Sequence, residues 1–505
     1  MIASCFIFFF FFFLFLIIFT FLFNFHLQTK HKTRKIRSPP GPPGLPLIGN
    51  LHQYDSLRPH VFLRNLSKKY GPIMSLRLGS RPVLVISSAK IAKEALKTND
   101  LVFSNRPPLV SHQKFSYNGL DVGFSPYGEY WREMRKITVL HLLSTKRVQS
   151  YHPILEDEVS KVVKEISDLC CSSQFINLSS MAMNLVSSVI CRIGFGKKYG
   201  KEDYIQKRRF EQILHETQAM FAGFFVSDYL PLLSWIDKLS GMSNRLEKNA
   251  KDLDLFYQEL IDEHLNPNRP DAMKDDILDL LIQMKQEKSS SFEFTWDHIK
   301  AMLMDIFVAG TDTNSALITW AMTALMRTPP AMKRAQSEIR EIVSKKGVIT
   351  EELLQELPYL DAVIKETFRM HPPIPIVLPR ETTKDCTIEG YHIEAKTMVL
   401  INAWAIAREP ESWNDPEDFV PERFLNNCID FRGNHFQLIP LGAGRRICPG
   451  ISLATSIAKI ALAYFLYSFD WELPTGMKIE DIDVDTARGV TMHKRIPLSL
   501  LAKKY

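Results

Sequence analysis

The decapeptide LGAGRRICPG at residues 441–450 constrains the structure of this chain most, because it sets one cysteine on a glycine-rich loop beside two arginines. Glycine adopts backbone conformations that other residues avoid, and it lets the backbone approach a flat ligand closely. A nearby arginine lowers the pKa of a thiol, so Cys448 is expected to act as a thiolate. The loop is therefore a candidate site for a metal held through sulfur. The alternative is a structural cysteine beside an ordinary glycine turn.

The other cysteines do not indicate a disulfide framework. The chain has seven cysteines in 505 residues, an odd number spread over a long sequence, unlike the dense even sets of small secreted scaffolds. A reducing compartment is therefore favoured. The six remaining cysteines have no flanking residues that indicate chemistry: Cys5, Cys170, Cys171, Cys191, Cys386 and Cys428.

The N-terminus is predicted to be a membrane anchor. No charged side chain occurs from Ile2 to Phe23, and residues 8–13 are all phenylalanine. About 20 apolar residues suffice to cross a bilayer. Basic residues begin at Lys30, just beyond the apolar run, which by the positive-inside rule leaves the rest of the chain in the cytosol. A cleaved signal peptide is the alternative, but the basic residues follow the apolar run and no small-residue cleavage site is evident.

The basic charge of the chain is local. The formal net charge is +6, from 62 basic and 56 acidic residues. Five of the basic residues crowd between positions 30 and 37, and removing them leaves 57 against 56 acidic residues. The nearly neutral remainder gives no support to a nucleic-acid-binding surface.

A proline-rich segment, PPGPPGLP at residues 39–46, follows the basic cluster. Proline fixes its own backbone dihedral and lacks an N–H donor, so neither a helix nor a central strand can form here. The segment is expected to be a semi-rigid spacer between the anchor and a globular body. A ligand for a proline-recognising domain is the alternative.

The remaining sequence predicts a mainly helical body with a small sheet. Residues 73–86 alternate in part around Gly79-Ser80, which is typical of a hairpin. Most later segments show helical spacing, and one clear example places five residues on a single face: Leu360, Val363, Ile364, Thr367 and Phe368. No shift in composition marks a second domain.

A long apolar helix is predicted from Trp296 to Arg327, interrupted by the run AGTDT at residues 309–313. Burying an acid and a hydroxyl without partners costs roughly several kcal/mol at worst, and a glycine inside a helix costs about 1 kcal/mol relative to alanine. A distorted, functional helix is the simplest explanation of this run. A solvated helix face with a tolerated glycine is the alternative.

The 441–450 loop resembles the haem-binding loop of the cytochromes P450. The family pattern Phe-x-x-Gly-x-Arg-x-Cys-x-Gly is matched by Gly444, Arg446, Cys448 and Gly450, with Leu441 where the family usually has phenylalanine. The resemblance implies that Cys448 is the axial ligand of haem iron. In P450s generally, this thiolate pushes electron density onto the iron and favours O–O cleavage.

The run at residues 309–313 is similar to the oxygen-activation motif of the same family. The resemblance implies that Ala309 and Gly310 give room for oxygen and substrate, and that Asp312 and Thr313 pass protons to bound dioxygen. Together with Pro372-Pro373, this run also resembles the plant A-type microsomal P450s, which oxidise specialised metabolites. The motifs occur in the order that the family has, from the anchor to Gly450.

Haem carries two propionates, so its site needs donors and cations at the edge, and arginine forks suit carboxylates better than lysine does. The resemblance assigns this task to Trp131 and Arg135, which would share a helix face, and to Arg380 and Arg446.

The resemblance also implies a structural triad of Glu366, Arg369 and Arg423. Glu366 and Arg369 stand three apart on a predicted helix, and as a bare pair they would indicate only a surface ion pair worth tenths of a kcal/mol. P450s join such a Glu-x-x-Arg helix to an arginine in a segment like PERF at residues 421–424. The buried network supports the haem loop and is costly to break, since removing one member leaves a charge without a partner.

The expected architecture is the cytochrome P450 fold, mainly α with small β-sheets, behind an N-terminal transmembrane helix. Residues 1–25 would form the signal anchor, residues 26–46 the basic and proline-rich linker, and residues 47–505 the haem-thiolate catalytic domain. The expected location is the endoplasmic reticulum membrane, with a single pass and the catalytic domain in the cytosol.

The implied function is a haem-thiolate monooxygenase that inserts one oxygen atom from O2 into a small apolar or aromatic plant specialised metabolite. The cofactor would be haem b. No complete Gly-x-Gly-x-x-Gly fingerprint for a nicotinamide occurs at the Gly442 loop, so electrons would come from NADPH through the membrane-bound NADPH–cytochrome P450 reductase, docking near Arg445. The expected partners are thus the substrate, O2, the reductase and the membrane, without nucleic acid.

By their place in the family layout, residues 103–124, 221–225, 374–378 and 489–491 would face the substrate, and their aromatic and aliphatic content fits an apolar small molecule. Two alternatives remain open. One is a P450 that rearranges hydroperoxides or dehydrates oximes without external oxygen, although such members often lose the helix threonine and Thr313 is present. The other is a membrane-tethered haem-binding protein without turnover.

Overall fold

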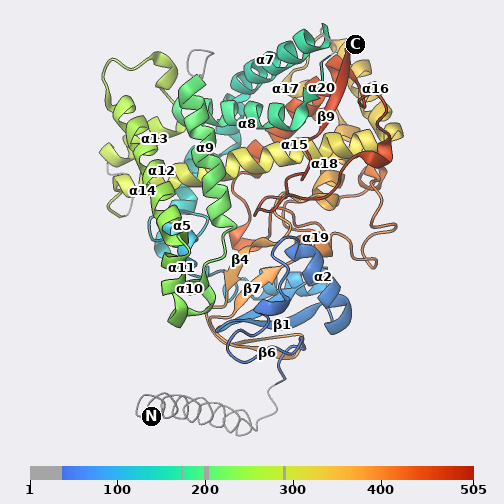
Figure 1. The fold of residues 1–505 in the computed structure, drawn as a ribbon. Helices are drawn as coiled ribbons and strands as arrows, with labels where there is room; N and C mark the ends of the chain where they lie inside the picture. Colours follow the sequence, from blue (N-terminus) through green and yellow to red (C-terminus); the bar gives the residue numbers. More distant parts are fainter. Residues whose placement is uncertain (1–36, 172–173, 198–203, 288–291) are drawn as a thin grey trace, which may run out of the picture.

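The computed structural model describes residues 37–171, 174–197, 204–287 and 292–505. The predicted anchor at residues 1–25, and the linker up to residue 36, lie outside the described residues. The described part is mainly helical with small sheets, which confirms the predicted fold class. Most helices form the upper body in Figure 1, and the largest sheet lies below them.

The proline-rich segment is attached to the sheet. The carbonyls of Pro39 and Pro40 accept hydrogen bonds from the hydroxyl and the backbone N–H of Ser75, at 2.9 and 2.8 Å. A Cβ on Gly41 would lie 1.9 Å from the carbonyl oxygen of Ser75, so only glycine allows this approach. Asn50 Nδ2 donates to two further carbonyls of the segment. The segment forms no helix, as predicted, but it packs on the body and is not a free spacer.

The predicted hairpin forms one side of a four-stranded sheet. β1 (Ile73–Leu78) pairs antiparallel with β2 (Arg81–Ile86), and Gly79 in the turn has a φ of +61°. β2 runs parallel to β7 (Met398–Ile401), which pairs antiparallel with β4 (Val377–Glu381). The four apolar residues that end β2 are all buried, as expected for an inner strand covered on both faces. β4 carries Arg380, so this sheet positions one candidate site residue.

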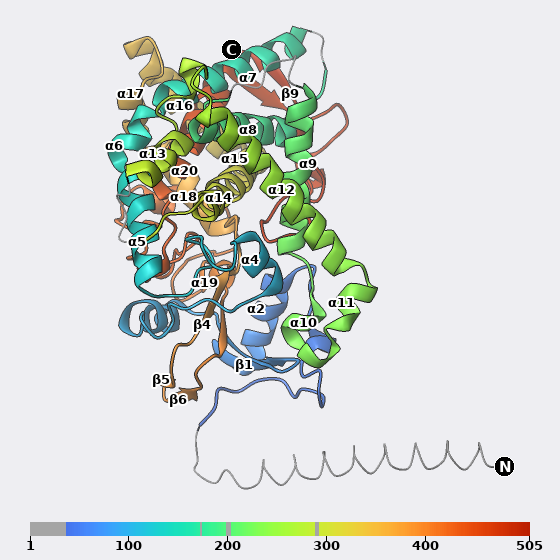
Figure 2. The same cartoon turned by 90° about the vertical axis from the view of Figure 1, so that its left-hand side faces the viewer.

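Helix α15 (Gly310–Arg327) crosses the middle of the helical body in Figure 1 and is seen end-on in Figure 2. It packs along α8 (Leu178–Phe195) and beside α18 (Pro358–Met370) and α20 (Ile451–Ser468). By length and hydropathy α8 and α20 could each cross a membrane. Much of each helix is buried inside the body, so this apolar character is that of core helices.

The predicted helix from Trp296 to Arg327 changes its hydrogen bonding in the middle. α14 (Trp296–Met304) leads into a π-helical turn, η7 (Asp305–Ala309), and then into α15. Single π-helical turns inside helices are frequent at functional sites. The distortion directly precedes Gly310, whose missing side chain lets Ile190 of α8 pack closely, since a Cβ would meet it at 2.9 Å.

The remaining elements surround this centre. The short strands are β3 (Ile176–Asn177), β8 (Phe469–Glu472) and β9 (Ser499–Lys504), which form one sheet, and β5 (Cys386–Ile388) and β6 (Tyr391–Ile393), which form another. The other α-helices are α2 (Pro59–Tyr70), α3 (Ala89–Lys93), α4 (Val110–Phe115), α5 (Glu129–Ile137), α6 (Thr145–Ser150), α7 (His152–Cys171), α9 (Tyr204–Phe221), α10 (Val226–Tyr229), α11 (Trp235–Leu239), α12 (Met242–Leu265), α13 (Ile277–Glu287), α16 (Pro329–Lys346), α17 (Glu351–Gln355) and α19 (Ala403–Ile406).

A buried ion network connects α18 with the irregular chain that follows α19. Arg369 donates from Nε and Nη2 to the two carboxylate oxygens of Glu366, at 2.7 and 2.8 Å, and both side chains are fully buried. Arg423 Nε donates to Glu366 Oε1 at 3.1 Å. Arg369 also donates to the carbonyls of residues 407, 416 and 418. The three residues of the predicted triad are therefore in contact, and they hold residues 407–423 against α18.

Replacing Glu366 with glutamine is expected to destabilise the protein by about 3–5 kcal/mol, because two guanidiniums lose the charge that they share. Chemical unfolding of the purified protein measures the change. Glu341→Gln is the matched control, since Glu341 forms an exposed ion pair with Lys345 at 2.8 Å on α16 and exposed pairs contribute little to stability. Equal losses in the two variants would contradict a buried triad.

Candidate active site

The loop at residues 441–450 folds back on itself before α20. The backbone N–H of Cys448 donates to the carbonyl of Leu441 at 3.0 Å. Gly442 and Gly444 have φ values of +73° and +69°, in the left-handed region that favours glycine. A Cβ on Gly444 would lie 2.3 Å from the carbonyl oxygen of Leu96. Any larger residue at 444 would therefore displace the loop that carries Cys448.

The Cys448 thiol lies just before the start of α20 and forms no disulfide. Burial raises its pKa, while the backbone N–H of Gly450 and the guanidinium of Arg135 act in the opposite direction. An arginine does lower the pKa of the thiol, as expected, but it is Arg135, and burial outweighs it in the thiol on its own. Arg446 turns its guanidinium toward backbone carbonyls elsewhere. Metal coordination would reverse the balance, since a coordinating thiol is deprotonated.

Three of the predicted arginines surround this loop. Arg135 Nη2 donates to a loop carbonyl, that of residue 447, at 2.6 Å, and Arg380 Nη2 donates to that of residue 443 at 2.8 Å. Arg446 is buried, with its guanidinium carbon 4.1 Å from the centre of the Trp131 ring. The indole N–H of Trp131 donates to the carbonyl of residue 122 at 3.0 Å. Trp131 therefore supports the arginines with its ring, and its N–H is already used by the backbone.

A fourth arginine, Arg106, joins this group and was not predicted. It is buried, and it donates to the carbonyl of Gly123 at 2.9 Å and to the carbonyls of Leu378 and Pro379 at 2.6 and 2.8 Å. Arg446 binds the same short loop, donating to the carbonyls of residues 122 and 125 at 3.2 and 2.6 Å. The loop at residues 121–125 is thus held by two guanidiniums.

These guanidiniums lie close enough to disfavour one another's charge. Burial is the main cause and the neighbouring arginines add to it, so that the pKa of Arg446 falls to about 8, that of Arg380 to about 9 and that of Arg106 to about 10. Asp100 lies 3.8 Å from Arg380 and offsets part of the charge. Arg380 Nε is buried and has no hydrogen-bond partner among the described residues. Buried cations with too few counter-charges favour an anionic ligand.

The residues present fit haem b. Its two carboxylates match a cluster of arginine forks in which one buried N–H still lacks an acceptor. Cys448 offers a single sulfur ligand for iron. Within the described ranges, no group of three or more histidine, cysteine, aspartate or glutamate side chains could hold a metal ion by itself. A metal that is already bound in a macrocycle and needs one protein ligand suits this site.

Helix α15 and the π turn before it present an accessible stripe. Ala309 is exposed, and Gly310 and Thr313 are half-buried, although the rest of α15 up to Met326 is buried. Ala309 and Thr313, at positions i and i+4, share one face of the helix, whereas Gly310 beside them is turned toward Ile190 of α8. Thr313 Oγ1 donates to the carbonyl of Ala309 at 2.6 Å. The accessible residues are therefore those expected to give room for oxygen and substrate.

Asp312 does not lie on this stripe. Its side chain is buried, and Oδ1 is 2.8 Å from Nε2 of His493 in the C-terminal segment. The two predicted relay residues, Asp312 and Thr313, are thus neighbours in sequence but differ in exposure. His493 was not predicted, and no motif around it in the sequence marks it.

The predicted substrate-facing stretches meet in two pairs. Phe124 stacks on Phe221 with ring centres 5.3 Å apart and on His112 at 4.1 Å, which joins residues 103–124 to residues 221–225. Burial lowers the pKa of His112 to about 3, so it packs as a neutral ring. The other two stretches are residues 374–378 and 489–491. Each lies next in sequence to one partner of a backbone hydrogen bond, which the N–H of Met492 donates to the carbonyl of Pro373 at 2.7 Å.

Two carboxyls bind backbone N–H groups of the loop at residues 121–125. Asp305 of η7 accepts from the N–H groups of Val122 and Gly123 at 2.7 and 3.3 Å, and Asp121 accepts from that of Phe124 at 2.9 Å. Burial raises the pKa of both carboxyls, to about 6 for Asp305, and the nearby Asp305 charge raises that of Asp121 further. The loop is thus bound by carboxyls through its N–H groups and by arginines through its carbonyls.

Asp121→Asn is expected to reduce the loss of stability as pH rises. The folded pKa of Asp305, about 6, lies above the ordinary 3.8, so the folded state holds the extra proton between these values and stability falls as pH rises through them. The pKa of Asp121 is raised well above 3.8 by burial and by the charge of Asp305, so Asp121 adds to this fall. Asparagine cannot titrate and still offers an oxygen to the N–H of Phe124. The thermal midpoint of Asp121→Asn should fall less steeply between about pH 4 and about pH 8 than that of the wild type or of the exposed control Asp271→Asn. Parallel curves would contradict the pairing.

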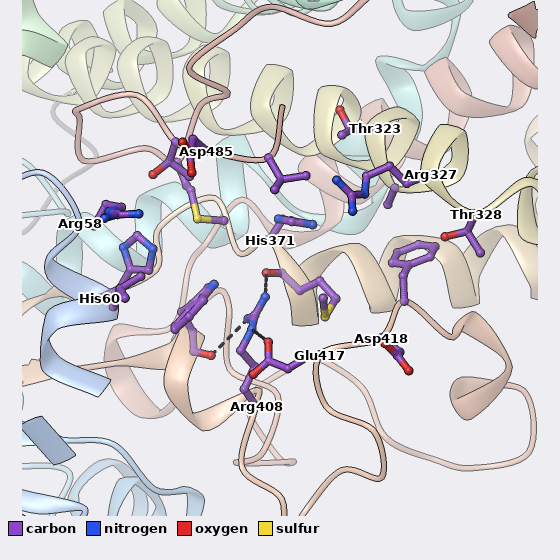
Figure 3. A pocket seen from close by; sticks show the side chains of 18 residues that line it. Arg58, His60, Thr323, Arg327, Thr328, His371, Arg408, Glu417, Asp418 and Asp485 are labelled. Atoms are coloured by element: carbon purple, nitrogen blue, oxygen red, sulfur yellow. Dashed lines mark hydrogen bonds and ion pairs between the residues drawn. The ribbon is translucent and has the colours of Figure 1, made fainter. Parts of the chain in front are cut away.

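A separate cavity of about 430 Å³ lies between the C-terminal half of α15 and α2. Figure 3 shows His371 and Arg408 among its lining side chains, with Arg408 bonded to Glu417 at 3.2 Å. None of the predicted site residues lines this cavity. It is not part of the site around the Cys448 loop.

Comparison with known proteins agrees with this geometry. The family model for cytochrome P450 matches residues 39–499. The chain is 48% identical to 6,7,8-trihydroxycoumarin synthase from Pastinaca sativa, over 94% of this chain and 95% of the other. Cytochrome P450 71A9 from Glycine max is 47% identical over 94% and 95%, and strychnine-11-hydroxylase from Strychnos nux-vomica is 46% identical over 94% and 93%. A solved zebrafish cytochrome P450 with abiraterone superposes with a TM-score of 0.73 at 26% identity, over 88% of this chain and 100% of the other.

A helical fold with a single cysteine on a glycine loop and an arginine cluster beside it defines a haem-thiolate enzyme. The chain belongs to the cytochrome P450 family, as its resemblance to that family predicts, and its relatives place it among the plant A-type P450 monooxygenases, which use haem b.

Proposed function

We propose that this P450 inserts one oxygen atom from O2 into a small apolar or aromatic plant specialised metabolite, with electrons that NADPH–cytochrome P450 reductase delivers from NADPH. Three features carry the proposal: the Cys448 loop, the arginines bonded to it, and the accessible residues Ala309, Gly310 and Thr313. They are connected through Val122, whose N–H is bound by Asp305 of the π turn and whose carbonyl is bound by Arg446. Bound haem supplies the reductive activation of dioxygen.

The cofactor would be held from two sides. Cys448 would provide the sulfur ligand of the iron. Gly444 lets the loop pack against the carbonyl of Leu96, and the missing side chain of Gly450 leaves the space beside Cys448 Sγ free. Arg135, Arg380 and Arg446, with Trp131 packed against Arg446 and with Arg106 beside them, would receive the two carboxylates. Balancing these charges stabilises both the cofactor and the surrounding protein.

Thr313 and Asp312 would supply protons to the oxygen-binding face. The Thr313 hydroxyl hydrogen is donated to the carbonyl of Ala309, so its oxygen can accept a hydrogen bond from a proton donor on the accessible stripe. Asp312, one residue away, provides an acid that is shielded from bulk water. The two side chains would hold a proton beside the accessible stripe, and they would take up a new proton after each transfer.

The proposed substrate class comes from the relatives and from the rings at the site. Two relatives are named for a trihydroxycoumarin and for strychnine. In this chain Phe124, Phe221 and His112 stack against one another. Aromatic rings favour offset stacking with other rings, so this wall suits a ligand with a flat ring system.

Residues at one end of the body support attachment to the endoplasmic reticulum membrane, with the predicted anchor as the single span and the catalytic domain in the cytosol. Leu232 is 94% exposed, Leu239 78% and Trp235 54%. They lie beside α10, which the backbone N–H of Ser80 joins to the β1–β2 turn at 2.7 Å, at the same end as the proline-rich segment (Figure 2). Clustered exposed apolar side chains fit a membrane-facing surface.

The proposed reductase site is the surface around Arg445. Arg445 is half exposed and pairs with Asp100 at 3.1 Å. Arg132 and Lys136 are exposed on α5, the helix from which Arg135 reaches the Cys448 loop. This basic surface lies close to the proposed iron ligand, which suits electron delivery from an acidic partner.

Thr313→Ala is expected to lower the product formed per NADPH by on the order of tenfold or more, because the stripe loses its hydroxyl. The carbon monoxide adduct of the reduced variant should keep the red-shifted Soret band of a thiolate ligand, since Cys448 is untouched. The measurement uses membranes with the reductase, NADPH, and a library of coumarins and alkaloids.

Thr319→Ala is the matched control for Thr313→Ala, because Thr319 makes the same type of bond, to the carbonyl of Ser315 at 2.8 Å, but is buried. Normal coupling in Thr313→Ala would refute the relay. Product formation without NADPH would point to a rearranging or dehydrating P450. Absence of the red-shifted band in intact wild type would refute the proposed iron ligand.

Phe221→Ala is expected to raise the KM for an aromatic substrate by about tenfold, since each ring pair contributes about 0.5–1.5 kcal/mol beyond the area buried. Initial rates over a substrate series give KM and kcat separately, and kcat should change less. Phe175→Ala, at a 62% exposed position near β3, is the control. An unchanged KM in Phe221→Ala would exclude this wall from the substrate site.

A further inference from the structure

The pair Asp312–His493 joins the central helix to the C-terminal segment. Asp312 Oδ1 lies 2.8 Å from His493 Nε2. The Asp312 side chain is 8% exposed, whereas that of His493 is 32% exposed. The imidazole therefore stands between a shielded acid and the accessible surface.

The backbone holds this imidazole in place. The N–H of His493 donates to the carbonyl of Thr491 at 3.0 Å, and its own carbonyl accepts from Ala487 at 2.8 Å. The carbonyl of the preceding residue, Met492, accepts from Nε1 of Trp320 on α15 at 2.5 Å. The C-terminal segment is thus folded around His493 and attached to α15 at the neighbouring residue, Met492, which holds His493 next to Asp312.

The charge state of His493 depends on Asp312. Burial lowers the pKa of His493, but the hydrogen bond and the charge of Asp312 outweigh burial and raise the pKa above its ordinary 6.5. The next residue, Lys494, donates instead to the carbonyl of Asp483 and lies 5.1 Å from the centre of the Trp320 ring. Among the charged groups described around the imidazole, Asp312 is therefore the one that favours its protonated form.

We propose that His493 is a positioning residue of the proton relay, through which the shielded Asp312 is recharged from solvent. The imidazolium gives its Nε2 proton to Asp312 Oδ1, which leaves a neutral imidazole and a carboxylic acid. Asp312 then gives this proton up toward Thr313 and returns to the carboxylate. The neutral imidazole, which has kept its Nδ1 proton, takes a proton from water at Nε2 and restores the ion pair. One proton moves inward in each cycle and the protein is unchanged. The inference rests on the proposed monooxygenase function and deepens it.

The test compares His493→Leu with His493→Gln in the full-length protein, in membranes with the reductase. Leucine removes the hydrogen bond, whereas glutamine can still donate an N–H to Asp312 but cannot titrate. Both variants should keep the red-shifted Soret band. Product per NADPH should fall by on the order of tenfold in His493→Leu, with the missing electrons recovered as hydrogen peroxide, less than the roughly hundredfold expected for loss of a general acid itself.

The pH profile separates proton transfer from simple packing. In the wild type, product per NADPH should fall as pH rises through the raised pKa of His493, because the neutral imidazole has no proton to give. The ratio should be flat with pH in His493→Gln. His392→Gln is the matched control: His392 is 30% exposed and lies 3.7 Å from Asp385 on the β5–β6 hairpin, and its loss should leave both ratio and profile unchanged.

A measurement without turnover tests the pair itself. A raised histidine pKa stabilises the folded state below about pH 6.5, and this contribution disappears as pH rises through the folded pKa. The difference in thermal midpoint between wild type and His493→Gln should therefore shrink with rising pH.

Two results would overturn the inference. A productive wild type whose coupling and pH profile are unchanged in both His493 variants would refute the role of His493 alone. A wild type that forms no product from any member of the library would refute the proposed function, and this inference with it. If His493→Leu does not retain haem, His493→Gln carries the decision through its pH profile.

Discussion

Like charges held together inside the protein are the constraint on which this structure depends. Arg106, Arg380 and Arg446 are buried and Arg135 is half-buried, and they lie near enough to weaken one another's charge. Backbone carbonyls satisfy many of their N–H groups but bring no full negative charge. The body around the Cys448 loop is therefore electrostatically incomplete without an anionic ligand, so cofactor binding and folding stability are thermodynamically linked.

The short loop at residues 121–125 connects these arginines to the other parts of the site. Its carbonyls are bound by Arg106, Arg446 and the Trp131 indole, and its N–H groups by Asp121 and Asp305. Elements that are far apart in sequence thus share one backbone segment. A change in the π turn at Asp305 would be felt by the arginines that flank the cysteine loop, although no side chain spans the distance directly.

The sequence predicts those parts of the site that local chemistry or a fixed spacing requires. Gly444 is needed because a backbone carbonyl occupies the place of its side chain, and Glu366 and Arg369 are paired by their helical spacing. Arg106 and His493 escape prediction because their flanking residues show no pattern, and their partners are distant carbonyls or an acid 181 residues away. Burial of Cys448, which raises the pKa of its thiol, is likewise not visible in the sequence, and the arginine that lowers this pKa is the distant Arg135 and not the neighbouring Arg446.

The attachment of the proline-rich segment to β1 has a consequence for how the enzyme would sit on a bilayer. Ser75 donates hydrogen bonds to the carbonyls of Pro39 and Pro40, and a side chain at position 41 would clash with this strand. The carbonyl of Arg37 also accepts a hydrogen bond from the N–H of His392 at 2.9 Å. Residues 37–41 therefore belong to the body, so a change in the angle between the body and a bilayer could not arise within them.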